Sequence, residues 1–153
     1  MNQMETTFWN EYLDSLPTKY VPSSYFVEAS PAGDLSTTDG LIALYLSGKK
    51  SAGSSLVEDF ETMGDPLPKE GIYWIILDGK SEPKLIVKTI KTEIHQFKNV
   101  PEHVAIAEGE GDSSLEYWKK VHIEFFGPYL ASWNIKNIDE AHVITEFFEV
   151  VWK

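Results

Sequence analysis

The chain has 153 residues, of which 42% are hydrophobic and 24% charged, and this is typical of one packed domain. Its formal net charge is −11, and all 13 basic residues are lysines. An acidic chain without arginine disfavours broad binding to a phosphate backbone, but it leaves room for a pocket that takes one nucleotide or nucleoside. The absence of cysteine excludes disulfides, thiolate metal sites and a cysteine nucleophile.

The first residues, 1–14, are acidic and polar and lack the basic start and apolar run of a signal peptide. No stretch approaches the roughly 20 apolar residues that a membrane-spanning helix needs. We therefore expect a cytoplasmic protein that contacts no membrane.

The first half of the chain mixes helical and strand patterns. Apolar residues at four-residue spacing predict a helix over 7–16, and a β-prone run predicts a strand over 24–28. A second helix is expected over 36–47, capped by Ser36, Thr37 or Thr38 and ended by Gly48. Leu56-Val57 is interpreted as the start of a strand, and residues 62–69 as a loop.

The middle of the chain predicts a hairpin of two strands, 72–77 and 85–94, joined by a turn. A helical turn or more is expected over 101–106. A third helix begins at Ser113, where Ser113-x-x-Glu116 is a capping box, and it ends at Gly127-Pro128. Its predicted apolar face consists of Leu115, Trp118, His122 and Phe125.

A last strand is expected over 142–152, with Val143 and Ile144 among the residues expected to be buried. Strands and helices do not alternate regularly, so a doubly wound sheet is disfavoured. The predicted fold class is α+β, a small mixed β-barrel with helices against its side, formed by one domain over residues 1–153.

The segment 46–55 combines a helix end, two lysines and several small residues. Small residues let a ligand approach the backbone, and a lysine offers a positive charge for a phosphate or carbonyl oxygen. The alternative is a solvated lysine pair favoured by the helix dipole. The candidate ligand-binding residues here are Gly48, Lys49, Lys50, Ser51, Ser54 and Ser55.

The segment 107–118 carries three acidic candidates, Glu108, Glu110 and Asp112, just before the third helix. The helix dipole alone would stabilise acids there. The functional interpretation makes one of them a general acid or base, or a partner that orients Lys50. The spacing matches no calcium loop, so neither a metal nor a cofactor is predicted.

The remaining candidates are weaker. His95, His103, His122 and His142 show no metal-binding spacing and are expected to be structural or on the surface. Three aromatic residues could stack on a base, although a place in the core is favoured for each: Tyr45, Trp74 and Trp133.

Several segments together resemble the ASCH domain family. They include Gly48-Lys49-Lys50, the Pro66–Gly71 loop, Leu77-Asp78-Gly79 and the Ala-Glu-Gly-Glu-Gly-Asp run that starts at Ala107. The resemblance covers nearly the whole chain from about residue 36, and it implies a PUA-like β-barrel that binds RNA or a nucleotide derivative.

Some small ASCH proteins are amidohydrolases that deacylate N-acetylated cytidine with a lysine, a threonine three residues later and a glutamate. The resemblance transfers the lysine to Lys50 and the glutamate to Glu110. The threonine position is Gly53, so the nucleophile would have to be Ser51 or Ser54.

Three functions follow as hypotheses. The first is a module that binds RNA or a nucleotide-like small molecule, not DNA, in a cleft around Lys50 and Glu110. The second is an amidohydrolase in which Lys50 is the base, Ser54 or Ser51 the nucleophile and Glu110 the acid. The third is a protein-interaction domain without small-ligand chemistry, for which a cleft filled by apolar side chains would be the sign.

Overall fold

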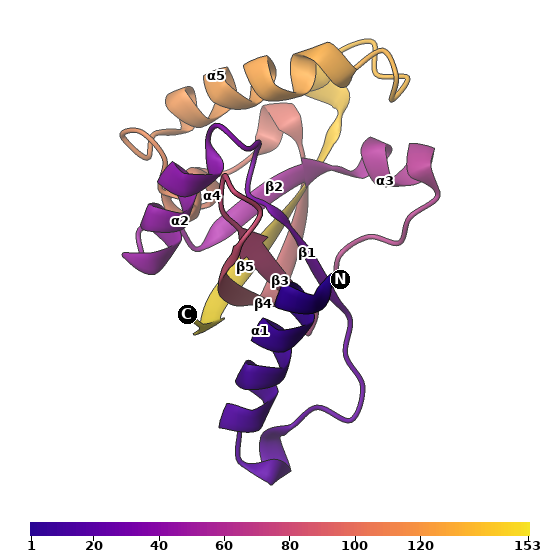
Figure 1. Cartoon of the computed structure of the whole chain (residues 1–153). Coiled ribbons are helices and arrows are strands. Elements are labelled where there is room, and N and C mark those ends of the chain that lie inside the picture. Colours follow the sequence, from indigo (N-terminus) through magenta and orange to yellow (C-terminus); the bar gives the residue numbers. More distant parts are fainter. The chain divides into compact units, whose positions relative to one another are not determined.

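The computed structural model describes residues 1–153 and contains five helices and one mixed five-stranded sheet with the strand order β1-β3-β4-β5-β2 (Figure 1). The helices are α1 (Gln3–Ser15), α2 (Thr38–Leu46), α3 (Val57–Met63), α4 (Glu102–Glu108) and α5 (Leu115–Phe126). The strands are β1 (Val27–Pro31), β2 (Ala52–Leu56), β3 (Tyr73–Leu77), β4 (Pro83–Gln96) and β5 (His142–Trp152).

The chain forms two compact units. The first comprises residues 1–48, 70–90 and 148–153, and the second comprises residues 49–69 and 91–147. Strands β4 and β5 each contribute residues to both units.

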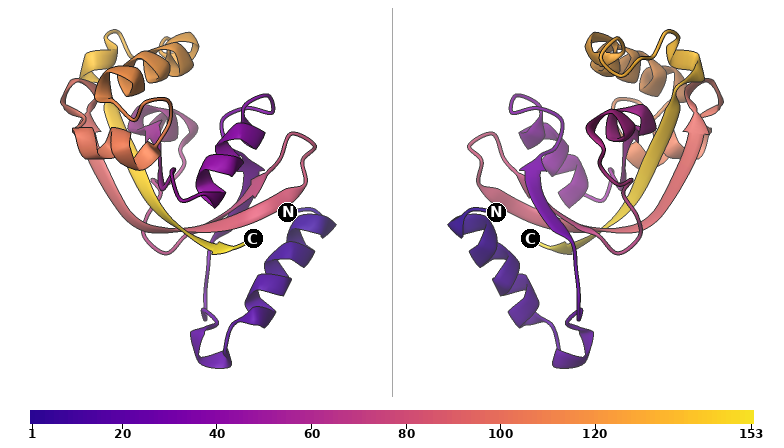
Figure 2. Two further views of the ribbon diagram at one scale, coloured as in Figure 1. Left: turned by 90° about the vertical axis from the view of Figure 1, so that its left-hand side faces the viewer. Right: turned by 90° about the vertical axis from the view of Figure 1, so that its right-hand side faces the viewer.

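In the first unit, β1 runs parallel to β3, and β3 and β4 form the predicted antiparallel hairpin, whose connecting loop is visible in Figure 2. Strand β1 begins at Val27, later than predicted, because its pairing with β3 starts at Val27 opposite Tyr73. Tyr25 and Phe26, which suggested the strand, are exposed.

Helix α1 starts earlier than predicted because Asn2 caps it. The Asn2 side chain accepts a hydrogen bond from the Glu5 N–H at 3.0 Å, and the Glu5 carboxylate accepts one from the Asn2 N–H at 2.8 Å. This reciprocal pair is a capping box, which satisfies two backbone donors at the helix start. The pattern Asn2-x-x-Glu5 was therefore a usable sequence signal.

The apolar residues of the first unit form two clusters. One surrounds Trp9, Tyr12 and Tyr73, and the other surrounds Tyr45, Ile76 and Phe148. Trp74 packs against the second cluster, so Tyr45 and Trp74 are core residues, as favoured from the sequence.

In the second unit, the prediction of a strand starting at Leu56-Val57 is wrong. Leu56 ends β2, and Val57 begins α3, which has Glu58 and Asp59 in its first turn and ends at Gly64. Acidic residues in a first turn favour a helix through its dipole. No helix in the structure has the length and apolar character needed to cross a bilayer.

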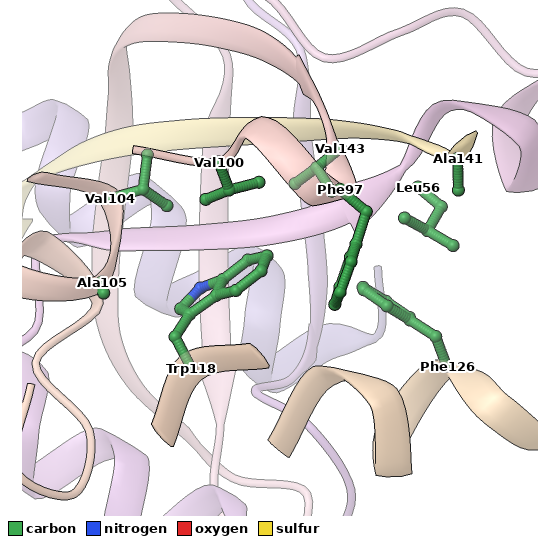
Figure 3. Close-up of a cluster of buried hydrophobic side chains, with 9 residues drawn as sticks. All are labelled: Leu56, Phe97, Val100, Val104, Ala105, Trp118, Phe126, Ala141 and Val143. Atoms are coloured by element: carbon green, nitrogen blue, oxygen red, sulfur yellow. The ribbon is translucent and has the colours of Figure 1, made fainter. Parts of the chain in front are cut away.

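The core of the second unit lies beneath α5, from which Trp118 and Phe126 point toward Phe97 and Val100 (Figure 3). Helix α5 buries Phe126 and leaves Phe125 exposed, so the prediction of Phe125 on the buried face is wrong. The spacing 118, 122 and 126 continues one side of the helix, because residues four apart lie one above another. Trp133 packs against the same cluster.

Candidate functional site

The site lies within the second unit and is built around Lys50, the residue two before β2. Its side chain is only 5% exposed, and its Nζ lies 3.0 Å from Glu110 Oε2 and 3.5 Å from Glu108 Oε1. The Ser51 N–H donates to the Ala107 carbonyl at 2.7 Å, which holds this part of the chain beside the end of α4. The ammonium group is thus enclosed between two carboxylates.

Glu108, the last residue of α4, is the buried centre of the site. Its Oε2 accepts hydrogen bonds from Ser54 Oγ at 3.0 Å and from the indole Nε1 of Trp118, while its Oε1 faces Lys50. Ser54 Oγ also lies 2.8 Å from Thr145 Oγ1. Antiparallel pairing of β2 with β5 creates this contact, because it sets Ser54 directly opposite Thr145.

The loop after α4 depends on two glycines with left-handed backbone. Gly109 has φ +62°, and a Cβ there would lie 2.0 Å from the Lys49 carbonyl oxygen. Gly111 has φ +57°, and a Cβ there would lie 2.5 Å from the Tyr117 ring. Only glycine fits such close approaches, so the loop can bring Glu110 over Lys50. The Glu110 side chain remains 26% exposed and forms the outer wall of the cluster.

His122 completes the site from α5. Its ring stacks on Trp118 with 4.0 Å between centroids, and its Nδ1 lies 2.7 Å from the Trp118 carbonyl oxygen. Its Nε2 lies 3.7 Å from Glu108 Oε1.

The space beside these groups is a cavity of about 10 Å³, lined by Glu108, Glu110, Tyr117, Trp118, Val121, His122 and their neighbours Ala105 and Ser114. By the usual measure this is room for about one water molecule. In place of the open cleft expected from the sequence, the structure has an ion-paired cluster beside a small cavity.

The structure brings four of the predicted site residues together: Lys50, Ser54, Glu108 and Glu110. Ser51 and Ser55 lie elsewhere. Ser51 is exposed, with its hydroxyl 3.3 Å from the Ala107 carbonyl, and Ser55 lies on the other face of β2 from Ser54 because side chains alternate along a strand.

The other predicted residues shape the surroundings. Gly48 follows α2 with φ +79°, and the exposed Lys49 reaches the Gly111 carbonyl at 3.4 Å. Asp112 lies at the start of α5, where the hydroxyl and N–H of Ser114 hydrogen-bond to its carboxylate and lower its pKa below the ordinary value. The predicted capping box at Ser113 is replaced by Ser114, whose side chain accepts from the Tyr117 N–H.

Sequence reasoning missed three residues of the site: Trp118, His122 and Thr145. Trp118 and His122 were assigned to an apolar helix face, and their spacing of four was read only as packing. Trp118 and His122 both carry ring N–H groups, and their helix directly follows the acidic loop 107–112. This combination was the sequence signal that could have placed them at the site. Thr145 gave none, since its role depends on pairing between β2 and β5.

No group of histidine, aspartate and glutamate side chains is arranged to hold a metal ion. The polar groups of the site are instead one ammonium, two carboxylates, two hydroxyls, one imidazole and one indole N–H. This set suits hydrogen-bond recognition and proton transfer.

A model of the ASCH domain matches residues 28–152, and the chain therefore belongs to the ASCH domain family. The α+β fold class predicted from the order of elements, and implied by the resemblance, is confirmed.

Two solved structures are similar over nearly the whole chain. An ASCH domain from Lactobacillus crispatus JV V101 is 25% identical, with a TM-score of 0.93 over 100% of this chain and 97% of that one. Protein EF3133 from Enterococcus faecalis V583 is 33% identical, with a TM-score of 0.81 over 99% of this chain and 90% of that one. The comparison with curated proteins gave no match.

Proposed function

We propose that the cluster of Lys50, Glu108 and Glu110 binds a nucleoside-type ligand. One observation carries the proposal: the Lys50 ammonium is almost fully buried between two carboxylates. Replacing a buried ion pair by apolar residues is often neutral or stabilising, so stability alone does not account for it.

The chemistry of the cluster matches the edge of a nucleobase. A base edge presents carbonyl and ring-nitrogen acceptors beside amino donors. Lys50 can donate to an acceptor on the ligand, and Glu108 can accept from a donor beside it, because Lys50 Nζ and Glu108 Oε1 lie 3.5 Å apart. Family membership adds support, since ASCH domains are associated with nucleic acid in general.

Charge favours a nucleoside over a polyphosphate or a long RNA. The chain carries a formal net charge of −11, and the cluster itself has two carboxylates for one ammonium. A phosphate would meet repulsion there, whereas a neutral base would not.

Entry of a base requires Glu110 to leave Lys50, because the present cavity of about 10 Å³ holds no ring. Glu110 is suited to this, since it is the partly exposed member of the cluster and lies between Gly109 and Gly111. The ligand would take the place of Glu110 on the ammonium, while Glu108 stays fixed by Ser54 and Trp118.

Calorimetric titration with plain and modified nucleosides, nucleotides and short RNAs tests the proposal. We expect nucleosides to bind, and Lys50→Met to weaken binding at least about tenfold, since a hydrogen bond to a charged group is lost. Lys98→Met is the matched control, because Lys98 is an exposed lysine of the same unit that pairs with Glu140. The proposal would be refuted if no ligand of the panel bound, or if Lys50→Met bound nucleosides as tightly as the wild type.

A second candidate function, hydrolysis of an acylated amino group, is favoured by the position of Ser54. Its Oγ is hydrogen-bonded to Glu108 Oε2, and the other oxygen of that carboxylate faces Lys50. In this reaction Ser54 Oγ bonds to the acyl carbon while its proton passes to Glu108. The C–N bond then breaks, the leaving amine takes that proton, and water hydrolyses the acyl-serine ester.

These roles differ from the predicted ones, because Glu108 rather than Lys50 lies next to the Ser54 hydroxyl. Lys50 would polarise the acyl carbonyl. Incubation with N-acetylcytidine tests the reaction, with acetyl-Ser54 detected by mass spectrometry. Ser54→Ala should abolish product formation, and Ser51→Ala should not. Undiminished turnover by Ser54→Ala would exclude the mechanism.

A further inference from the structure

The tautomer of the neutral His122 ring is set by its backbone partner. Nδ1 lies 2.7 Å from the Trp118 carbonyl oxygen, and a carbonyl can only accept. Nδ1 therefore carries a proton, and the neutral ring presents a lone pair at Nε2.

That Nε2 faces an acceptor rather than a donor. It lies 3.7 Å from Glu108 Oε1, beyond hydrogen-bond distance, and the His122 side chain is only 9% exposed. Glu108 Oε1 already accepts from Lys50 Nζ at 3.5 Å, whereas no group donates to Nε2, and two acceptors that face each other repel. A group carrying N–H or O–H bonds, placed between them, would satisfy both.

The space for such a group exists. The cavity of about 10 Å³ is lined by both residues, by Glu110 and by the rings of Tyr117 and Trp118. It has the size of one heavy atom with its hydrogens. Its carboxylates and its imidazole Nε2 are all acceptors, and aromatic faces also attract a positively charged amino group.

We propose that this cavity binds the amino group of the ligand, with His122 Nε2 and Glu108 Oε1 as the two acceptors. For a nucleoside, the group is the exocyclic amine of the base. The inference rests on the proposed function and makes it more specific: amino-bearing bases bind, and their oxo counterparts are rejected. An oxo group would bring a third acceptor into the cavity, where it would repel Glu108 Oε1 and leave Nε2 still without a donor.

The first experiment compares matched ligands by calorimetry: cytidine with uridine, and adenosine with inosine. Wild-type protein should prefer the amino member of each pair by about tenfold or more. His122→Phe keeps a ring against Trp118 but removes the acceptor, so the preference should fall to about threefold or less. His142→Phe is the control, because His142 is an exposed histidine of the same unit paired with Glu58.

The second experiment needs no nucleoside. Nitrogen NMR of histidine-labelled full chain at pH 8 should show His122 protonated at Nδ1 and bare at Nε2. Addition of methylammonium chloride should shift the Nε2 resonance, whereas potassium chloride at equal ionic strength should not. A proton found on Nε2, or no response to methylammonium, would overturn the inference.

The two experiments separate the inference from the proposed function. Equal binding of cytidine and uridine would refute the amino-group site and leave nucleoside binding intact. Failure of every nucleoside to bind would refute the proposed function, and the methylammonium response would then decide the amino-group site by itself.

Discussion

The two units of the molecule both bury apolar clusters, but they differ in the charged residues that they bury. The first unit buries aromatic and aliphatic residues, and its fully buried Thr38 has backbone partners for its hydroxyl, the Ala32 N–H and the Leu77 carbonyl. The second unit buries a similar apolar cluster but also encloses Lys50, Glu108 and His122. Apolar burial stabilises a fold, whereas buried charge mainly costs desolvation. The buried Glu5 carboxylate of the first unit caps its own helix, whereas the charges buried in the second unit form the cluster on which the proposed function rests.

The largest expected effect comes from breaking the charged cluster on one side. Glu108→Ala removes a carboxylate beside the buried Lys50, leaves Trp118 Nε1 without an acceptor and takes one of two hydroxyl partners from Ser54 Oγ, which keeps Thr145. We expect a loss of about 3–5 kcal/mol in the free energy of unfolding, measured by urea denaturation. Glu140→Ala, which removes an exposed acid of the same unit, should change it by less than about 0.5 kcal/mol.

The double variant Lys50→Met, Glu108→Gln sharpens this prediction. It removes both charges but keeps an acceptor for Trp118, so its stability should equal or exceed that of the wild type while nucleoside binding is lost. A loss of more than about 2 kcal/mol would show that the cluster is structural, and the comparison between the units would fail.

The next effect tests the loop that carries Glu110. Gly109→Ala would place a Cβ 2.0 Å from the Lys49 carbonyl oxygen, so we expect a loss of about 3 kcal/mol. Gly64→Ala is the matched control in the same unit. Gly64 has φ +72° with open space around its Cβ position, so only the backbone cost of about 1 kcal/mol applies. If Gly109→Ala and Gly64→Ala lowered the free energy of unfolding equally, the contact between position 109 and the Lys49 carbonyl would not contribute to the loss.

A smaller effect is expected in the first unit, as a loss of stability at alkaline pH. Burial, with the neighbouring Tyr73, raises the pKa of Tyr12 to about 12. The folded state then holds a proton that the unfolded state releases above about pH 10, so stability is complete below pH 10 and declines as pH rises toward 12. Thermal unfolding should show a loss on the order of 2 kcal/mol across that interval. Tyr12→Phe should make stability nearly independent of pH between pH 10 and 12. An unchanged pH dependence in this variant would show that a group other than Tyr12 titrates there.

The smallest effect concerns Asp112, a fully exposed residue of the second unit. Its lowered pKa means that its contribution is present above the unfolded value near 4 and disappears as pH falls through the folded value. Asp112→Asn should therefore slightly reduce stability at pH 7 and leave it unchanged at pH 2, as measured by thermal unfolding. If the variant is as stable as the wild type at both pH values, Asp112 does not stabilise the start of α5.

Local patterns predicted most elements because each depends on neighbours in sequence. The β3–β4 hairpin, helix α5 and strand β5 were found from periodicity and turn residues alone. The failures have local causes too. The prediction for α1 overlooked Asn2, and that for α5 chose Phe125, three positions after His122, where the helix buries Phe126, four positions after it.

The candidate site was predicted only in part. Lys50, Ser54, Glu108 and Glu110 were all candidates, but sequence gave no order among the carboxylates and treated Glu110 as the principal acid. The structure makes Glu108 the buried centre, since it lies at the end of α4 and accepts from both β2 and α5.

By itself, the sequence determined the family, the succession of elements and the two segments that supply the charged groups, because these follow from spacing and residue type. Only the tertiary structure decided that Ser54 lies opposite Thr145 and that His122 turns Nε2 toward Glu108. Those facts depend on strand register and on the face that a helix buries. Both are set by contacts between residues that are far apart along the chain, and no local pattern encodes them.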